Sequence, residues 1–145
     1  MGDVVRNQGH ASGMAGEFFI LERLFRLGCE PTLSLGNAKK IDILVEPKSQ
    51  IGRVKKISVK TIKSKTKWPI IKIKDELLLT DESLFIALVY YHDFSDLKTD
   101  PFVWIVPANK IKDMSESWFE YLAINYKRKL DQLEVYANAW HLISM

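Results

Sequence analysis

The sequence contains few of the residues on which several common chemistries depend. It has a single cysteine, Cys29, which excludes an internal disulfide and a cysteine-based zinc site. Its three histidines, His10, His92 and His141, are far apart and follow no metal-ligand spacing. Glycine-rich phosphate loops and the Gly-x-Ser-x-Gly nucleophile motif are also absent. No apolar run could span a bilayer and residues 1–13 lack a secretory core, so we expect a cytoplasmic protein without a membrane partner.

Length and composition are those of an ordinary globular protein. The chain has 145 residues, of which 47% are hydrophobic and 27% are charged. This is enough apolar material to form one substantial core. The sequence contains no internal repeat and no linker-like stretch. We therefore expect a single domain over residues 1–145, in which residues 1–11 form a flexible arm because they show no periodicity.

An amphipathic helix is predicted near the start of the chain. Ser12 can cap this helix and Gly28 can end it, so we expect it to span residues 13–27. At 100° per residue, one apolar arc gathers Met14, Phe18, Leu21, Leu24 and Phe25. Glu17 lies at the edge of this arc, where a carboxylate is costly unless it is paired or binds a metal. Alternatively, Glu17 is favoured by the helix dipole and reaches back to solvent.

Two runs rich in β-branched residues predict a β-hairpin. The runs cover residues 41–45 and 56–61, and a turn over residues 47–52 separates them. Because side chains alternate between the faces of a strand, Asp42 in the first run and Lys60 in the second face the same general space. A carboxylate suits Mg²⁺, and a nearby lysine can orient water and stabilise charge on a phosphate. A buried salt bridge between Asp42 and Lys60 is the simpler alternative.

The remainder of the chain is predicted to add further strands and then helices. Strands are expected over residues 29–35, 70–74, 84–91 and 102–106. The run Leu84 to Tyr91 is apolar enough to be a central strand that is buried on both faces. A short helix is expected over residues 107–112, and a second helix is expected after Ser115. The aromatic tail from Tyr136 onward is expected to fold back onto the core.

The sequence resembles the PD-(D/E)xK nuclease superfamily, whose members have the restriction-endonuclease-like fold. In that family an Asp starts one strand, and Glu-x-Lys or Gln-x-Lys, often followed by Thr, lies on the next. Asp42 is similar to the first position, and Lys60-Thr61 is similar to the end of the second. Gly16-Glu17 is similar to a Gly-Glu pair that relatives often carry in the first helix. Ser58 departs from the pattern, because it stands where Glu or Gln is usual.

The resemblance implies an α/β fold and a role for each of these residues. The fold would be a mixed sheet flanked by helices, with an αβββ core, further strands and a C-terminal helical part. Asp42 would be the main ligand of Mg²⁺ or Mn²⁺, and Glu17 would hold the metal directly or through water. Lys60 would position the attacking water and stabilise the phosphate. Ser58 would offer only a hydroxyl or an adjacent carbonyl, such as that of Val59.

Basic residues are concentrated around the predicted hairpin. Residues 47–74 contain ten lysines and arginines and no acidic residue, although the net charge of the chain is only +3. Such a block attracts a polyanion such as nucleic acid, or it is a solvated lysine face. The residues that we predict to contact nucleic acid are Lys39, Lys40, Lys56, Lys63, Lys65 and Lys67.

Three functional hypotheses follow from these residues. The first is a Mg²⁺-dependent endonuclease that hydrolyses DNA phosphodiester bonds. It would act as a homodimer if both strands are cut, because two strands need two sites. The second is a nucleic-acid-binding or accessory module of the same fold that has lost catalysis, which the serine at position 58 favours. The third is an interaction protein in which the basic block is incidental. Metal binding separates the first from the others, and salt-dependent DNA binding separates the second from the third.

Overall fold

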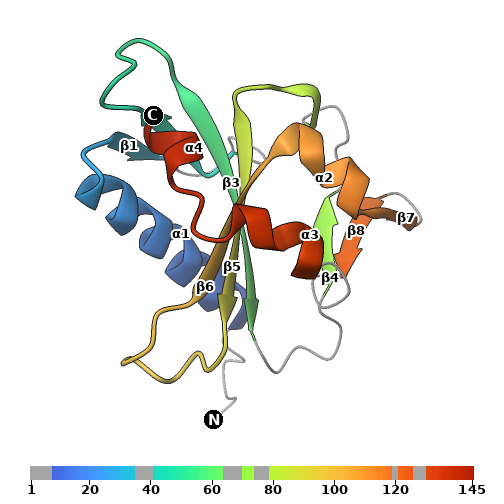
Figure 1. Ribbon diagram of the computed structural model, residues 1–145. Helices are drawn as coiled ribbons and strands as arrows, with labels where there is room; N and C mark the ends of the chain where they lie inside the picture. Colours follow the sequence, from blue (N-terminus) through green and yellow to red (C-terminus); the bar gives the residue numbers. More distant parts are fainter. Residues whose placement is uncertain (1–7, 35–40, 64–69, 74–78, 119–120, 126–129) are drawn as a thin grey trace.

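The computed structural model describes residues 8–34, 41–63, 70–73, 79–118, 121–125 and 130–145 (Figure 1). Its elements in chain order are α1 (Gln8–Arg26), β1 (Glu30–Leu33), β2 (Ile43–Glu46), β3 (Lys55–Lys63), β4 (Ile70–Ile73), β5 (Leu84–Tyr91), β6 (Phe102–Pro107), α2 (Ala108–Met114), β7 (Glu116–Trp118), β8 (Tyr121–Asn125), α3 (Leu130–Leu133), η2 (Glu134–Tyr136) and α4 (His141–Ser144). Among the helices described, none has the length and apolar character that crossing a bilayer requires.

A mixed five-stranded sheet in the order β1-β2-β3-β5-β6 forms the centre of the molecule. The predicted hairpin is confirmed, because β2 and β3 pair antiparallel with Ile43 opposite Ile57. Strand β5 pairs parallel with β3 and antiparallel with β6, so the apolar run is the buried inner strand that its composition predicts. A parallel pair needs a crossover connection, and residues 64–83 supply it. The predicted mixed α/β architecture is therefore confirmed.

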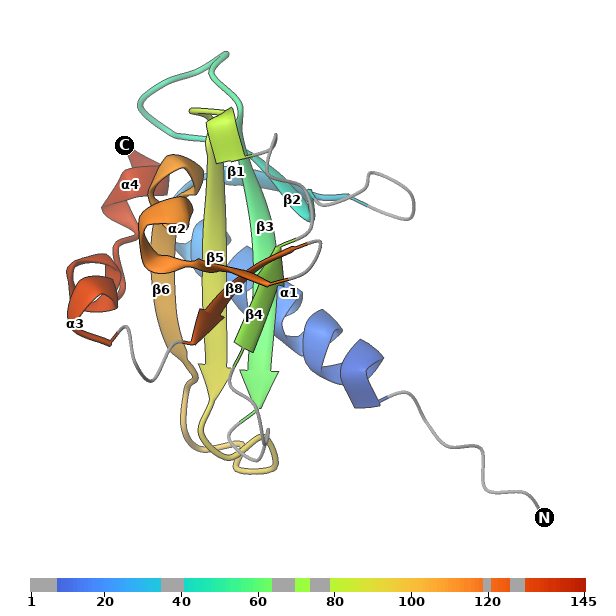
Figure 2. The same cartoon turned by 90° about the vertical axis from the view of Figure 1, so that its right-hand side faces the viewer.

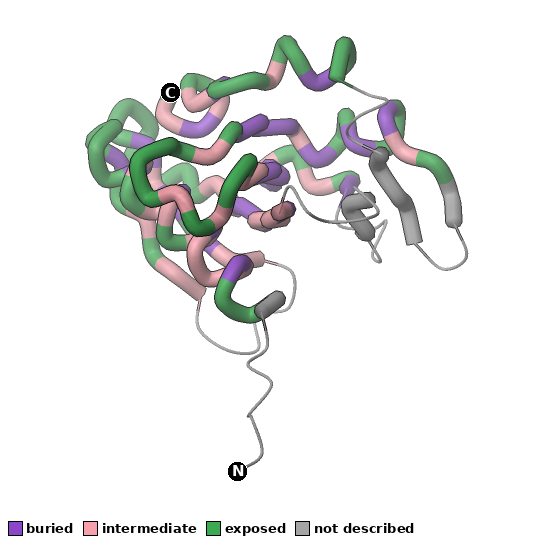
Figure 3. Tube along the Cα trace, turned by 90° about the horizontal axis from the view of Figure 1, so that it is seen from below, coloured by how far each residue is buried: buried purple, intermediate pink, exposed green. Residues whose placement is uncertain are grey.

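The two faces of this sheet bury two separate apolar clusters. Figure 2 shows β4 and β8 in front of the main sheet and α1 behind it. The α1 face buries residues such as Ile20, Ile57 and Ala87, and residues from the C-terminal segment join them. The opposite face buries Leu88 and Ile111 together with other residues of the strands, α2 and α3. In Figure 3 most of the purple, buried segments lie toward the middle of the tube and the green, exposed ones toward its outside, as expected for a sheet that is covered on both sides.

Helix α1 differs from the prediction in its start and in the face that it buries. It begins at Gln8, so residues 8–11 are helical and do not belong to a flexible arm. The side that packs on the sheet carries Ser12, Gly16, Ile20 and Leu24, all of which are buried. Phe18 and Phe25 from the predicted arc are 52% and 56% exposed. The prediction was wrong because half of the buried face consists of small residues, which periodicity of apolar residues does not detect.

After Ser115 the described residues 116–118 and 121–125 are extended, so the helix predicted over them was wrong. Strands β7 and β8 form a hairpin, and β8 pairs antiparallel with β4 to make a second, three-stranded sheet. The strand predicted over residues 70–74 is thus confirmed as β4. Pairing between segments some fifty residues apart overrides the helical spacing of Trp118, Tyr121 and Leu122, because cross-strand contacts decide β structure.

The C-terminal segment packs against the main sheet, as its apolar composition predicts. Ala139 and Ile143 are buried in the cluster on the α1 face. Ala137 forms a β-bridge with Trp104, so the segment covers part of the free edge of β6. The Lys55 ammonium donates hydrogen bonds to the carbonyls of Leu142 at 2.9 Å and Ile143 at 3.2 Å. Burial lowers the pKa of Lys55. This lysine of the basic block therefore has a structural task.

Candidate active site at the fork of two strands

Strands β2 and β3 separate at Asp42, and the Asp42 side chain accepts a hydrogen bond there that a backbone carbonyl would otherwise accept. The Asp42 amide still donates to the Ile57 carbonyl at 2.9 Å. One step further along β3, the Val59 amide donates to the Asp42 carboxylate at 2.6 Å. A backbone donor whose strand partner turns away must find another acceptor. The Asp42 side chain supplies that acceptor, and its orientation is fixed in turn by the backbone of β3.

Glu17 reaches the same place because α1 lies very close to β3. Gly16 permits this approach, because a Cβ at that position would overlap the Thr61 hydroxyl oxygen. Burial, a side-chain hydrogen bond to Asp42 and the negative charge of Asp42, in that order of importance, together raise the pKa of Glu17 from 4.5 to about 7. Two carboxyl groups from distant parts of the chain are thus in direct contact.

This carboxyl pair is suited to a hydrated divalent cation. Two carboxylates held together repel one another unless a proton or a cation lies between them, and after burial and the hydrogen bond this repulsion contributes to the raised pKa of Glu17. Mg²⁺ commonly binds through one or two carboxylates and keeps several water molecules. In the part of the chain that the structure describes, no group of three or more Asp, Glu, His or Cys side chains gathers at a metal-binding distance. The site therefore fits a metal that is bound by Glu17 and Asp42 and completed by water.

Ser58 and Lys60 lie on β3 on either side of the residue that Asp42 contacts. Their neighbours Ile57 and Val59 pack toward α1, so the side chains of Ser58 and Lys60 point to the other face of the sheet. Ser58 is only 4% exposed, and Lys60 is half-buried. Between the described residues, no hydrogen bond or ion pair links Lys60 to Asp42 or Glu17. The structure thus brings Glu17 and Asp42 together. Lys60 directly follows Val59, whose amide contacts Asp42.

A solved structure has a similar arrangement of elements over most of its length. A bacterial homing endonuclease matches with a TM-score of 0.60 at 14% sequence identity, and the match covers 93% of this chain and 92% of that chain. The chain has the restriction-endonuclease-like fold. A Holliday junction resolvase from the archaeal hyperthermophile Archaeoglobus fulgidus matches with a TM-score of 0.47 at 14% identity, covering 79% of this chain and 89% of that chain. No protein-family model and no curated protein matches the sequence.

The lysines predicted to bind nucleic acid are only partly placed on this restriction-endonuclease-like fold. Lys39, Lys40, Lys65 and Lys67 lie outside the described residues. The Lys56 ammonium forms an ion pair with Asp81 at 2.7 Å. Hydrogen bonds from Lys56 and Ser83 lower the pKa of Asp81 to about 2. The Lys63 ammonium lies 4.6 Å from the centre of the Phe94 ring. Both described lysines therefore have partners within the chain, and their contact with nucleic acid stays a prediction.

Two features near the site were not visible in the sequence. The first is the anchoring of Asp42 by a backbone amide, which no residue type signals. The second is the Gly16–Thr61 contact, which leaves the buried Thr61 hydroxyl without a hydrogen-bond partner among the described residues. The glycine beside Glu17 and the threonine after Lys60 were the only available signals.

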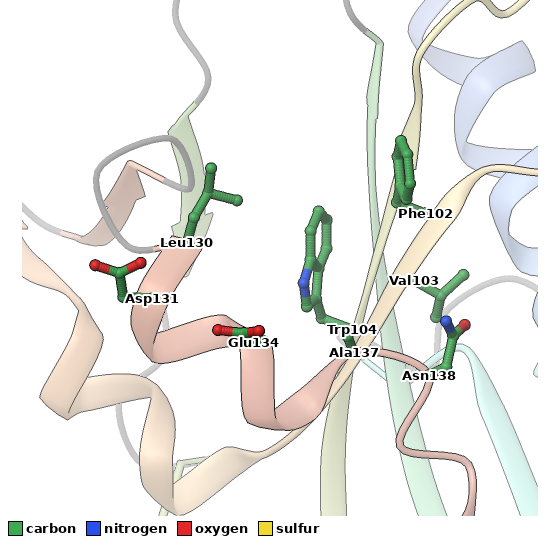
Figure 4. Close-up of a pocket in the computed structure, with 8 residues that line it drawn as sticks. All are labelled: Phe102, Val103, Trp104, Leu130, Asp131, Glu134, Ala137 and Asn138. Carbon is green, nitrogen blue, oxygen red and sulfur yellow. The ribbon is translucent and has the colours of Figure 1, made fainter.

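A pocket of about 300 Å³ lies elsewhere, along β6 and the C-terminal segment (Figure 4). Its lining consists of Phe102, Val103, Trp104, Leu130, Asp131, Glu134, Ala137 and Asn138. In Figure 4, the aromatic side chains of β6 face Leu130 and the two carboxylates across the opening. None of the predicted site residues belongs to this lining, so the pocket is separate from the carboxyl pair.

The Glu17 pKa predicts how stability depends on pH in metal-free protein. An ordinary pKa of 4.5 raised to about 7 means that the folded state holds a proton that the unfolded state has already lost over this range. Stability should therefore fall as pH rises from about 4.5 to about 7 and then level off. Urea denaturation across this range in the presence of a chelator measures the effect. Glu17→Gln should flatten the decline, and Glu22→Gln on the exposed side of α1 should not. Identical profiles for all three proteins would contradict the assignment.

Proposed function

We propose that this chain is a metal-dependent endonuclease that hydrolyses phosphodiester bonds in DNA. The observation that carries the proposal is the contact between the Glu17 and Asp42 carboxyl groups at the fork of β2 and β3. Keeping two acids together is costly unless a proton or a cation joins them. The likeness of the fold to a homing endonuclease supports the same conclusion.

Each residue of the site has a distinct task in this proposal. Glu17 and Asp42 would hold Mg²⁺ or Mn²⁺, which when bound supplies positive charge to the phosphate and lowers the pKa of a water ligand. The hydrogen bond from the Val59 amide keeps the Asp42 carboxylate in one orientation, so that little is lost to reorganisation. Lys60 leaves β3 on the face of the sheet away from α1, so it would reach past the fork of β2 and β3 to orient the attacking water and stabilise the negative charge that develops on the phosphate.

A catalytically impaired DNA-binding module is the second candidate, and Ser58 is the observation that favours it. This side chain is buried and short, and its hydroxyl is a weaker ligand for Mg²⁺ than a carboxylate. With only two carboxylates, the metal would be bound loosely and the reaction would need millimolar concentrations of the ion. In this reading the fold and the basic hairpin persist, and the chain holds DNA without cutting it.

A cleavage assay with Lys60→Gln tests the proposed function. Plasmid and single-stranded DNA are incubated with the wild type in Mg²⁺ or Mn²⁺, and nicking is followed with time. The wild type should cut, and Lys60→Gln should cut roughly 100-fold more slowly, because a positive charge at the reacting phosphate is lost. Lys110→Gln, which changes an exposed lysine on α2, is the matched control and should cut normally.

The other outcomes of this assay would support the DNA-binding module or the interaction protein. Retention of DNA at low salt without cutting in either metal would replace the endonuclease by the binding module. Neither cutting nor retention would remove both and leave an interaction protein.

A further inference from the structure

The loop that joins β2 to β3, residues 47–54, projects beyond the end of the main sheet. Figures 1 and 2 show it clear of the other elements at the upper end of both views. Pro47 is buried at its base, and every residue from Lys48 to Val54 is exposed. Two successive turns shape it, with hydrogen bonds from the Gln50 amide to the Pro47 carbonyl at 3.2 Å and from the Arg53 amide to the Gln50 carbonyl at 3.0 Å.

The second of these turns presents an isoleucine at its corner. Gly52 has a φ of +89°, which is the conformation of the third residue of a type II turn. Ile51 is the second residue of that turn and is 84% exposed. A β-branched apolar residue has no advantage at this corner, where proline is favoured, and its exposure contributes nothing to the core. The turn therefore holds a large apolar side chain outward at the tip of the loop, where it can contact another molecule.

The charges around Ile51 are all positive on the loop itself. Lys48 and Arg53 are exposed on either side of it, and the sequence contains no acidic residue between positions 47 and 63. Two acids, Glu30 and Glu46, lie opposite each other on β1 and β2 at the base of the loop. A polyanion is thus attracted to the tip and repelled from the side of the base that carries β1.

We propose that this hairpin loop is a DNA wedge, in which Ile51 enters between adjacent base pairs from the minor groove while Lys48 and Arg53 hold the flanking phosphates. Isoleucine is among the side chains that unstack and kink a duplex in this way. An arginine beside it suits the negative potential of the minor groove. The inference rests on the proposed function, because it assigns a way in which the same protein holds its DNA substrate.

The hairpin also determines where the kink falls relative to the cut. Arg53 lies six positions before Val59, whose amide contacts Asp42. At about 3.3 Å per residue, the tip lies roughly 20 Å from the carboxyl pair. This distance corresponds to about six base pairs at 3.4 Å each. The kink and the cut are therefore expected about half a helical turn apart.

Binding and bending of DNA test this inference without any need for cleavage. A duplex with a fluorescence donor and acceptor at its ends is titrated with protein in a chelator, so that binding and end-to-end distance are measured together. The wild type should shorten that distance. Ile51→Ser should abolish the shortening and weaken binding about tenfold, since the burial of an isoleucine side chain is lost. Lys48→Gln and Arg53→Gln should each reduce the slope of log K against log salt by about one.

Control variants separate the wedge from a general loss of surface apolarity or charge. Leu97→Ser changes a side chain that is 94% exposed in the loop between β5 and β6, at the other end of the sheet, and should bind and bend DNA like the wild type. Lys98→Gln in the same loop should leave the salt slope unchanged. All these positions are exposed, so the variants should keep the thermal midpoint of the wild type.

These results test the DNA wedge and the endonuclease activity separately. Bending that depends on Ile51, in a protein that fails to cut, would uphold the wedge and remove the endonuclease. Cutting by a wild type that does not bend DNA, or bending that Ile51→Ser retains, would overturn the wedge alone. Ile51-dependent binding to vesicles of anionic phospholipid, with DNA bending unaffected by the substitution, would assign the loop to a lipid surface and likewise overturn it.

Discussion

Asp42→Asn is expected to slow Mg²⁺-dependent DNA cleavage by at least about 100-fold while the protein stays folded. Asparagine retains an oxygen that can accept the hydrogen bond now given by the Val59 amide at 2.6 Å. It removes the negative charge that a metal ion needs beside Glu17. The substitution thus removes the metal-binding charge of this side chain and keeps its hydrogen-bond acceptor. Asp42→Ala would remove both, because it also leaves a backbone donor without its acceptor, at a cost of about 1–3 kcal/mol.

Initial rates of plasmid nicking and thermal denaturation of the same preparations measure this prediction. Asp113→Asn removes an exposed carboxylate on α2 and should change neither quantity. A variant Asp42→Asn that cuts within a few-fold of the wild type would contradict the role of Asp42 as a metal ligand. Loss of the thermal transition in Asp42→Asn would instead show that the charge itself is needed at the fork of β2 and β3.

Gly16→Ala should destabilise the protein by about 1–3 kcal/mol, although alanine is the better helix former by about 1 kcal/mol. The added methyl group would overlap the Thr61 hydroxyl oxygen, so α1 and β3 would have to move apart. The same displacement would carry Glu17 away from Asp42 and reduce cleavage. Thr61→Ala in the same protein removes that oxygen, which has no hydrogen-bond partner among the described residues. The double variant should therefore recover most of the lost stability.

A double-mutant cycle by urea denaturation measures the coupling between positions 16 and 61. Gly13→Ala is the matched control, because a Cβ at Gly13 would meet no heavy atom within 4 Å. It should stabilise the protein by up to about 1 kcal/mol through helix propensity alone. Equal effects of Gly13→Ala and Gly16→Ala would show that the close approach of α1 to β3 places no demand on Gly16.

Local patterns in the sequence predicted the main strands of the central sheet and singled out two acids as candidate site residues. Alternation and β-branched residues predicted β2 and β3, and the long apolar run predicted the buried strand β5, because burial on one face or two leaves a direct pattern along a strand. Asp42 was selected because alternation places it, near the start of one strand, in the same general space as Lys60 on the next, and because it matches the family pattern. Glu17 stood out because a carboxylate at the edge of an apolar arc needs a partner.

Contacts between distant segments decided what those patterns could not. The buried face of α1 follows small residues that let it approach β3, so Phe18 and Phe25 lie outside although their spacing is that of a core stripe. Strands β7 and β8 exist because β4 pairs with β8. The raised pKa of Glu17 comes from its burial and from its contact with Asp42, twenty-five positions away. Periodicity indicates which residues can be buried. The partner that covers each residue, or that shifts its pKa, is determined by the packing of the whole chain.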